Sequence, residues 1–227
     1  MNAPERTWRF YGRRKGRPLK PRQRRLMEEL LPRLAIDDDG PVDPAGLFEQ
    51  RPERVEMEIG FGGGEHLARL AAARPETGFI GCEPFIDGVA KLLVAIEEKG
   101  LSNIRLFADD ARHLLPRVTA ASLDALYLLY PDPWPKTRHH KRRFVNQQTL
   151  AHIHRLLKPG GLFFFASDID DYVRWTLMHI RRHGGFEWRA QRAADWKDPP
   201  PGWRSTRYEQ KALREGRPPT YLRFYKR

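Results

Sequence analysis

The sequence has almost no cysteine and no long apolar run. Its 227 residues include one cysteine, Cys82, which cannot form an internal disulfide, so we exclude a disulfide-rich secreted framework and expect a reducing, cytoplasmic location. The longest apolar runs, such as residues 162–166, are far too short to cross a bilayer. Arginines occupy the N-terminus, where a signal peptide needs an apolar core. Neither export nor a membrane partner is therefore expected.

The histidines show no metal-binding pattern. His152 and His154 are two positions apart, which on a helix points them to different sides, and no cysteine or carboxylate completes a ligand set. We therefore expect no metal site.

Acidic residues are scarce at the start of the chain. Glu5 is the only acid among the first 25 residues, whereas residues 6–25 contain ten lysines and arginines. Removing residues 1–25 lowers the formal net charge of the chain from +12 to +3. A segment of this composition cannot build a core, so we expect a flexible, disordered basic arm over residues 1–25. Its arginines and aromatic residues suit RNA phosphates and bases, although a polybasic tail also suits an anionic membrane.

Apolar runs rich in β-forming residues alternate with stretches of helical periodicity. The expected strands cover residues 55–59, 79–83, 104–107, 123–130 and 162–167, and the expected helices cover residues 65–74, 85–99, 111–115, 145–156 and 170–183. This alternation predicts an α/β fold with a doubly wound, mostly parallel sheet. Residues 186–191 and 220–225 are expected to form final strands that flank a loop rich in proline and tryptophan. We divide the chain into the arm (1–25), a helix and linker (26–53) and a compact domain (54–227).

A glycine-rich turn follows the first expected strand. Gly60 and Gly62 lie between Glu58 and Glu65, and such a turn lets a backbone approach a ligand closely at the start of a helix. A dinucleotide fingerprint needs a small residue where Glu65 stands, and two carboxylates around the turn oppose a pyrophosphate. The turn favours a cationic ligand without phosphate, and S-adenosylmethionine has both properties.

Acids also follow the next two expected strands. Glu83 stands 23 residues beyond Gly60, close to the separation expected for a carboxylate that binds ribose hydroxyls. Asp109 and Asp110 follow the third strand, and we expect one of them to reach the adenine while the other caps the next helix. In a doubly wound sheet these residues meet at the carboxyl edge of the strands, where ligands bind.

A proline-framed loop follows the fourth expected strand. Asp132 stands between Pro131 and Pro133, and Trp134 offers a stacking face. Prolines fix the backbone of such a loop, so it suits the positioning of a planar base. A basic cluster follows, and its charge indicates contact with a polyanion; the alternative is a solvated helix start. The cluster consists of Arg138, His139, His140, Lys141, Arg142 and Arg143.

Three motifs together resemble the bacterial tRNA (guanine-N7-)-methyltransferase family. They are Glu58-Ile-Gly-Phe-Gly62, Pro131-Asp-Pro-Trp134-x-Lys136-x-Arg-His-x-Lys-Arg-Arg143 and Thr206-x-Tyr-Glu209. The resemblance covers the chain from about residue 54 to the C-terminus, and the middle motif is highly specific. Tyr130 and Tyr208 stand where phenylalanine is common in that family. The resemblance implies the Rossmann-like fold of class I methyltransferases and methyl transfer from S-adenosylmethionine to N7 of guanine 46 in the tRNA variable loop.

The resemblance also implies roles for single residues. Asp132 would be catalytic, and the cofactor would be bound by Glu58, Gly60, Gly62, Glu83, Asp110 and Asp132. The substrate would be bound by Lys136, Asp168, Thr206, Arg207, Tyr208 and Glu209, and the basic cluster would contact the RNA.

Other functions remain open at this point. A methyltransferase for another RNA would share these features, and a non-catalytic RNA-binding module would explain the charge but not the acids after successive strands. A nicotinamide oxidoreductase would share the fold, but Glu58 and Glu65 oppose its pyrophosphate. The oligomeric state, monomer or homodimer, is also left open.

Overall fold

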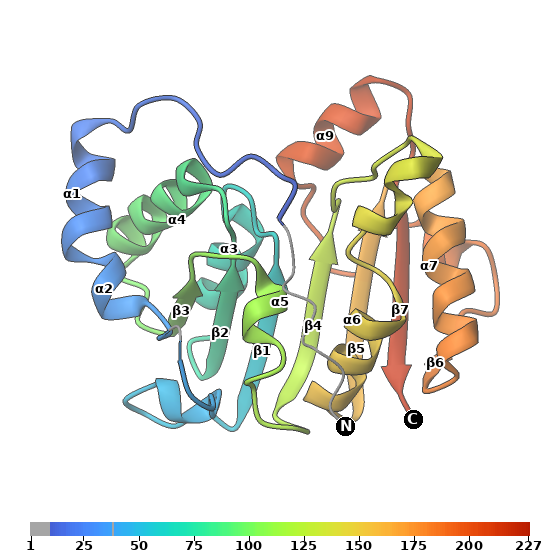
Figure 1. Ribbon diagram of the computed structural model, residues 1–227, viewed down its shortest axis with the longest axis horizontal. Coiled ribbons are helices and arrows are strands. Elements are labelled where there is room, and N and C mark those ends of the chain that lie inside the picture. The colour runs from blue at the N-terminus through green and yellow to red at the C-terminus, as the bar shows by residue number, and fades with distance from the viewer. Residues whose placement is uncertain (1–9, 38) are drawn as a thin grey trace.

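A seven-stranded sheet forms the centre of the computed structural model, which describes residues 10–37 and 39–227 (Figure 1). The strands are β1 (Arg54–Ile59), β2 (Thr77–Cys82), β3 (Ile104–Phe107), β4 (Leu123–Leu129), β5 (Leu157–Ser167), β6 (Phe186–Trp188) and β7 (Thr220–Lys226). Their order is β3-β2-β1-β4-β5-β7-β6. The first five strands are parallel, whereas β7 runs antiparallel to both β5 and β6. The predicted mostly parallel, Rossmann-like sheet is confirmed.

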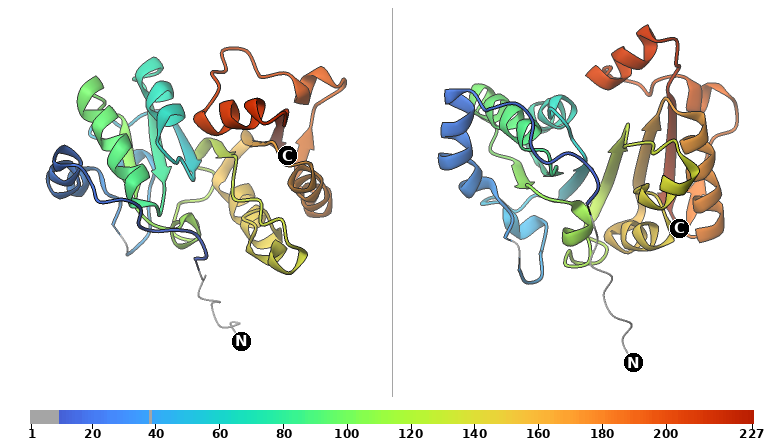
Figure 2. Two further views of the ribbon diagram at one scale, coloured as in Figure 1. Left: turned by 90° about the horizontal axis from the view of Figure 1, so that it is seen from above. Right: turned by 45° about the horizontal axis from the view of Figure 1, so that its top comes forward.

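Helices cover both faces of this sheet (Figure 2). The helices are α1 (Pro21–Glu29), α2 (Leu31–Leu34), α3 (Glu65–Ala73), α4 (Ile86–Lys99), α5 (Ala111–Leu114), α6 (Gln147–Leu156), α7 (Asp170–His183), α8 (Ala194–Lys197) and α9 (Arg207–Arg214), with 3₁₀ turns η1 (Ala45–Leu47) and η2 (Thr137–Arg142). On one face, Phe79 of β2 packs in a cluster with Leu67 of α3 and Leu92 of α4. On the other face, Met57 of β1 packs in a cluster with Ile153 of α6. Burial on both faces explains why the central strands are continuous apolar runs.

The C-terminal third differs most from the sequence-based expectation. The strand expected over residues 186–191 stops at Trp188, and the loop expected after it contains two helices, α8 and α9. Helix α9 is capped by Thr206, whose Oγ1 accepts a hydrogen bond from the backbone N–H of Glu209 at 3.2 Å. Figure 1 shows that α9 stands above the carboxyl edge of the parallel strands. The missed helix therefore belongs to the side of the molecule where a ligand is expected.

The N-terminal segment also departs from its expected boundaries. Helix α1 begins at Pro21, inside the segment assigned to the arm, and buries Leu26 in the same cluster as α4. Residues 10–20 run from α1 across the molecule towards the centre of the sheet (Figure 1). The backbone oxygen of Arg14 accepts a hydrogen bond from the N–H of Ile86 at 3.0 Å, and its guanidinium lies 2.7 Å from Asp109. Residues 1–9 of the expected arm lie outside the described residues.

The described helices are all too short or too polar to cross a membrane.

Candidate functional site

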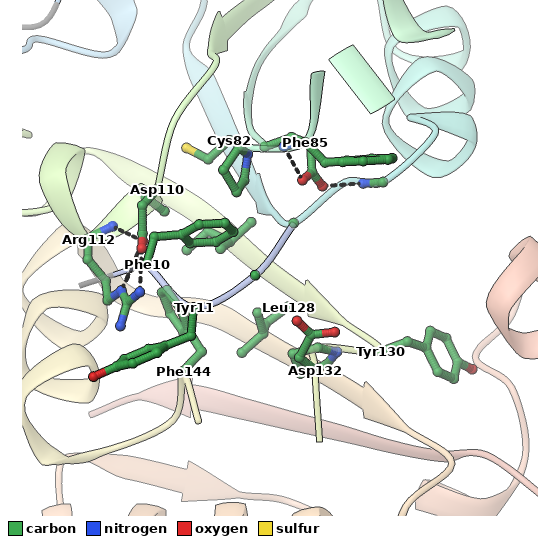
Figure 3. A pocket seen from close by; sticks show the side chains of 18 of the residues that line it. Phe10, Tyr11, Cys82, Phe85, Asp110, Arg112, Leu128, Tyr130, Asp132 and Phe144 are labelled. Carbon is green, nitrogen blue, oxygen red and sulfur yellow. Dashed lines mark hydrogen bonds and ion pairs between the residues drawn. The ribbon is translucent and has the colours of Figure 1, made fainter. Parts of the chain in front are cut away.

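A cavity of about 410 Å³ lies at the carboxyl ends of the central strands (Figure 3). Its lining includes Gly60 and Gly62 after β1, Glu83 after β2, Asp110 after β3 and Asp132 after β4. Parallel strands bring the segments that follow them to one edge of the sheet, which explains why residues so far apart in sequence meet here. The cavity thus joins five of the residues expected to bind a cofactor.

Glu83 accepts a hydrogen bond from the glycine turn. Its Oε2 accepts a hydrogen bond from the N–H of Gly62 at 2.8 Å, and its Oε1 accepts one from the N–H of Phe85 at 2.9 Å. Gly60 and Gly62 have φ angles of 70° and 57°, a conformation that favours glycine. Burial raises the pKa of the Glu83 carboxyl, and the two backbone bonds oppose this rise. A carboxylate has about four acceptor positions, so Glu83 keeps capacity for hydroxyl donors of a ligand.

Asp110 is both a helix cap and a wall of the cavity. Its Oδ1 accepts a hydrogen bond from the backbone N–H of Arg112 at 3.0 Å, and the Arg112 guanidinium also binds its carboxylate (Figure 3). Asp109 instead faces the N-terminal segment, where it pairs with Arg14. Asp110 is therefore the helix cap and also the one of the two neighbouring aspartates that lines this cavity.

The loop after β4 has an unusual backbone. Tyr130 and Trp134 have φ angles of 50° and 44°, which are uncommon for residues with a side chain and require support from their surroundings. The N–H of Tyr130 donates to the backbone oxygen of Ala166 at 2.8 Å. Between these two residues, Asp132 faces the cavity while keeping contact with solvent. Partial desolvation raises the pKa of the Asp132 carboxyl.

Glu58 does not line this cavity. It is 2% exposed, and its Oε2 lies 2.8 Å from Nδ1 of His66 in α3. Strand alternation places Glu58 on the same face of β1 as Glu56, which binds Arg74 beyond α3. The sequence placed Glu58 and Asp132 together among the residues expected to bind the cofactor. Asp132 lines the described cavity, whereas Glu58 has an internal partner in α3.

Tyr208 is the substrate candidate that reaches the cavity. It projects from α9 over the glycine turn, where a Cβ built on Gly62 would lie 3.2 Å from Tyr208 Cε2. Partial burial, followed by the charges of Glu83 and Asp132, raises the pKa of the Tyr208 hydroxyl. The Tyr208 side chain and both carboxylates line the same cavity.

The other substrate candidates do not line the cavity. Asp168 accepts a hydrogen bond from Arg217 at 2.7 Å, and Arg207 lies 3.6 Å from Glu65. Glu209 is 2% exposed, and its carboxylate accepts hydrogen bonds from three neighbouring side chains. These donors are Trp203 at 2.8 Å, Ser205 at 2.9 Å and Tyr221 at 2.7 Å. Thr206 caps α9, and Lys136 is exposed just before η2. Glu209 thus ties the start of α9 to Trp203 and Tyr221.

The residues of the basic cluster lie in different surroundings. Arg138 and Lys141 are exposed, whereas His139 and His140 lie against Trp134 and Trp175 respectively. Arg142 lines the cavity, and its guanidinium carbon lies 4.9 Å from the centre of the Trp134 ring and 4.4 Å from the centre of the Tyr11 ring.

Arg143 is buried, and its side chain has 0% exposure. The expectation that it contacts RNA is therefore corrected, because protein groups surround its guanidinium.

The N-terminal segment supplies cavity residues that the sequence did not assign there. Phe10, Tyr11, Gly12 and Arg13 all line the cavity, and Figure 3 shows the rings of Phe10 and Tyr11 among its walls. The aromatic residues in the basic arm were the available signal, although their distance in sequence from the sheet hid their position. Cys82 is buried and also reaches the lining.

Within the described part of the chain, no group of three or more histidine, cysteine or acidic side chains could hold a metal ion.

Comparison with known sequences identifies close relatives. Residues 52–222 match the family model described as "Putative methyltransferase". A tRNA (guanine-N(7)-)-methyltransferase of Rhizobium meliloti is 58% identical over 217 residues, which cover 95% of this chain and 94% of the relative. The protein of the same name from Mesorhizobium japonicum is 52% identical and covers 100% and 99% of the two chains. A third, from Brucella melitensis, is 53% identical and covers 96% and 94%.

Solved structures share the fold at low sequence identity. The 16S rRNA methyltransferase KamB superposes with a TM-score of 0.57 at 14% identity, over 77% of this chain and 88% of the other. A structure described as "a putative methyltransferase from streptococcus mutans in complex with SAH" superposes with a TM-score of 0.51 at 12% identity, over 78% and 90%. Both similarities concern the fold alone.

Proposed function

This chain belongs to the family of tRNA (guanine-N(7)-)-methyltransferases, and we propose that it transfers the methyl group of S-adenosylmethionine to N7 of a guanine in tRNA. The observation that carries the proposal is that Glu83, Asp132 and the glycine turn line one and the same cavity. The family resemblance of the three motifs implies that the target guanine stands at position 46 of the variable loop.

The cavity fits S-adenosylmethionine better than it fits a phosphate-bearing cofactor. The N–H of Gly62, which would be needed to bind a pyrophosphate, already donates to the Glu83 carboxylate. The charges of Glu83 and Asp132 suit a ligand with an ammonium and a sulfonium group and no phosphate. The cavity volume also lies in the range of about 300–1,000 Å³ usual for small-molecule sites.

Separate residues would hold separate parts of the cofactor. Glu83 would accept hydrogen bonds from the ribose hydroxyls, and Asp110, fixed by Arg112, would stand on the adenine side. Gly60 and Gly62 would let the backbone approach closely. When bound, S-adenosylmethionine supplies an electrophilic methyl group on a sulfonium.

Asp132 would orient the guanine. Guanine N7 carries an in-plane lone pair and no proton at neutral pH, so no general base is needed to create the nucleophile. The carboxylate of Asp132 would accept hydrogen bonds from the N1 and N2 donors of the base or from the cofactor ammonium, and so align N7 with the methyl group. Its negative charge would also follow the positive charge that moves onto the purine, a smaller effect because the total charge does not change.

The tRNA would approach across two basic parts of the surface. Arg138 and Lys141 stand exposed beside the proline-framed loop, and the N-terminal segment brings Arg13 to the cavity itself. Phosphate contacts of this kind supply sequence-independent affinity. Lys136, Asp168, Thr206, Arg207 and Tyr208 remain our candidates for contacts closer to the target nucleotide.

The proposal is tested by radiolabelled methyl transfer from S-adenosylmethionine to bulk tRNA, followed by cleavage at N7-methylated guanosine. Cleavage at position 46 is expected; labelled tRNA that resists this cleavage, or the absence of label, would contradict the proposed reaction. Asp132→Ala should lower kcat at least about 100-fold with the fold intact, because the group that orients the base is lost. Near-normal turnover by a purified, folded Asp132→Ala protein would remove Asp132 from the mechanism.

A further inference from the structure

Arg143 is the largest fully buried side chain of the described residues. Its charge suggested a surface role, yet the residue is only 1% exposed. A buried guanidinium is costly unless its donors are bound and its charge is paired. The contacts of Arg143 therefore show what it does inside the protein.

Arg143 joins the loop that carries Asp132 to helix α7. Its Nε donates a hydrogen bond to the backbone oxygen of Pro133 at 2.9 Å. Its Nη2 forms an ion pair with Asp171, in the first turn of α7. Its guanidinium carbon lies 4.9 Å from the ring of Tyr172 and 5.1 Å from the ring of Trp175. One planar cation thus connects a backbone carbonyl, a carboxylate and two aromatic rings.

Helix α7 also holds the chain just beyond Arg143. The indole Nε1 of Trp175 donates to the backbone oxygen of Val145 at 2.6 Å, and the N–H of Val145 donates to the hydroxyl of Tyr172 at 3.3 Å. Helix α7 therefore contacts both the side chain of Arg143 and the backbone two residues beyond it. The Arg143 guanidinium also lowers the pKa of the Asp171 carboxyl, as expected for a formed ion pair.

The loop needs such an anchor. Three of its residues are prolines without a backbone N–H, so it can make few hydrogen bonds of its own. The Pro133 carbonyl directly follows Asp132, and Trp134, the next residue, has the uncommon φ of 44°. Backbone in a sparsely populated conformation persists only where the surroundings enforce it.

We propose that Arg143 is a positioning residue for methyl transfer. By bridging the Pro133 carbonyl and Asp171 of α7, Arg143 fixes the position of Asp132 in the cavity. This inference rests on the proposed function. Lysine keeps the positive charge but lacks the planar fork, and so cannot bind Pro133 and Asp171 and pack between the two rings at once.

The test compares Arg143→Lys with the wild-type protein and with Arg181→Lys, an exchange of the same kind at an exposed position of α7. The turnover number is measured at saturating tRNA and S-adenosylmethionine, and is divided by the number of cofactor sites found by equilibrium dialysis. This division removes the effect of any unfolded fraction. Arg143→Lys should lower kcat per site at least about tenfold, because a displacement of about 1 Å can cost up to about 100-fold. Arg181→Lys should stay within twofold of wild type.

The salt dependence of tRNA binding separates positioning from RNA contact. Loss of one phosphate contact would reduce the slope of log K against log salt by about 1. Lysine could keep a phosphate contact, so an Arg-to-Lys exchange would not show the change in slope. The slope is therefore measured for two methionine variants. Arg143→Met should match wild type, and Arg138→Met should show the reduced slope.

A double-mutant cycle with Asp171→Asn tests the connection itself. Asp171 acts through Arg143, so Asp171→Asn should lower kcat per site more than twofold in the wild-type background and add nothing to Arg143→Lys. The Asp171 carboxylate is 61% exposed, so this variant should fold even if Arg143→Lys and Arg143→Met do not.

Three results would overturn the inference: a loss below tenfold in folded Arg143→Lys, a reduced salt slope in Arg143→Met, or additive effects in the cycle. If the Arg143 variants do not fold, a fall of twofold or less in Asp171→Asn overturns it. Failure of the proposed function would look different, because the wild-type protein itself would then not methylate tRNA.

Discussion

Replacement of Glu83 by glutamine should weaken S-adenosylmethionine binding through the glycine turn. Each oxygen of the Glu83 carboxylate accepts a hydrogen bond from a backbone N–H. Oε2 accepts from Gly62 at 2.8 Å, and Oε1 accepts from Phe85 at 2.9 Å. A glutamine of the same shape offers one oxygen and one NH₂ group, so one of the two N–H groups must face another donor. The turn, or the residue that opens α4, must then shift.

The structure sets the scale of this effect. A hydrogen bond to a charged group contributes about 1.5–3 kcal/mol, which corresponds to about 10- to 150-fold in a dissociation constant. Burial raises the pKa of Glu83, so the neutral amide avoids the cost of desolvating a charge. The thermal midpoint should therefore change little while cofactor affinity falls.

Calorimetric titration with S-adenosylmethionine measures the change. Glu53→Gln, the same exchange at an exposed position before β1, is the matched control and should bind like wild type. A Glu83→Gln dissociation constant within about threefold of wild type would show that Glu83 neither holds the turn for the cofactor nor binds it.

Three further predictions concern pH and the N-terminal segment. Because N7 needs no base, kcat should be nearly flat from about pH 6.5 to 8.5 when methyl transfer limits the rate; a steep limb in this range that disappears in Asp132→Asn would indicate base catalysis. The raised pKa values of Glu83 and Asp132 mean that both carboxyls take up protons at a higher pH than usual. On acidification, the affinity for S-adenosylmethionine should therefore fall at a higher pH than it would for ordinary carboxyls. Titrations at decreasing pH that show no such fall would mean that neither charge binds the cofactor. Deletion of residues 1–20 should reduce the salt slope of tRNA binding and also weaken cofactor binding, because residues 10–13 line the cavity; unchanged values of both would show that the segment contributes to neither.

The sequence predicted the sheet and the acids that follow its strands because both depend on local rules. Periodicity marked the buried strands, and parallel strands bring the residues after them to one edge. These two rules suffice to place Glu83, Asp110 and Asp132 in one cavity. Helix α9 was missed although Thr206 and Glu209 have the spacing of a capping box, because prolines and tryptophans around them suggested a loop.

The sequence was a poorer guide where a partner from another element of the fold decides what a charged group contacts. Glu58 has the chemistry of a cofactor ligand, but His66 from α3 binds it. Arg143 belongs by sequence to a basic cluster, but the side chains that enclose it come from α7, about 30 residues later. Residue type and spacing indicate that a charge needs a partner, but packing between elements determines which partner it has.

The antiparallel course of β7 has a practical consequence for work with this enzyme. Because β7 runs against β5, it ends at the edge of the sheet opposite the cavity, where the N–H of Arg227 donates to the backbone oxygen of Gly185. An affinity tag or fluorophore attached after Arg227 would stand away from the reacting groups. The same label attached before Phe10 would be joined to a wall of the cavity, so purification handles belong at the C-terminal end.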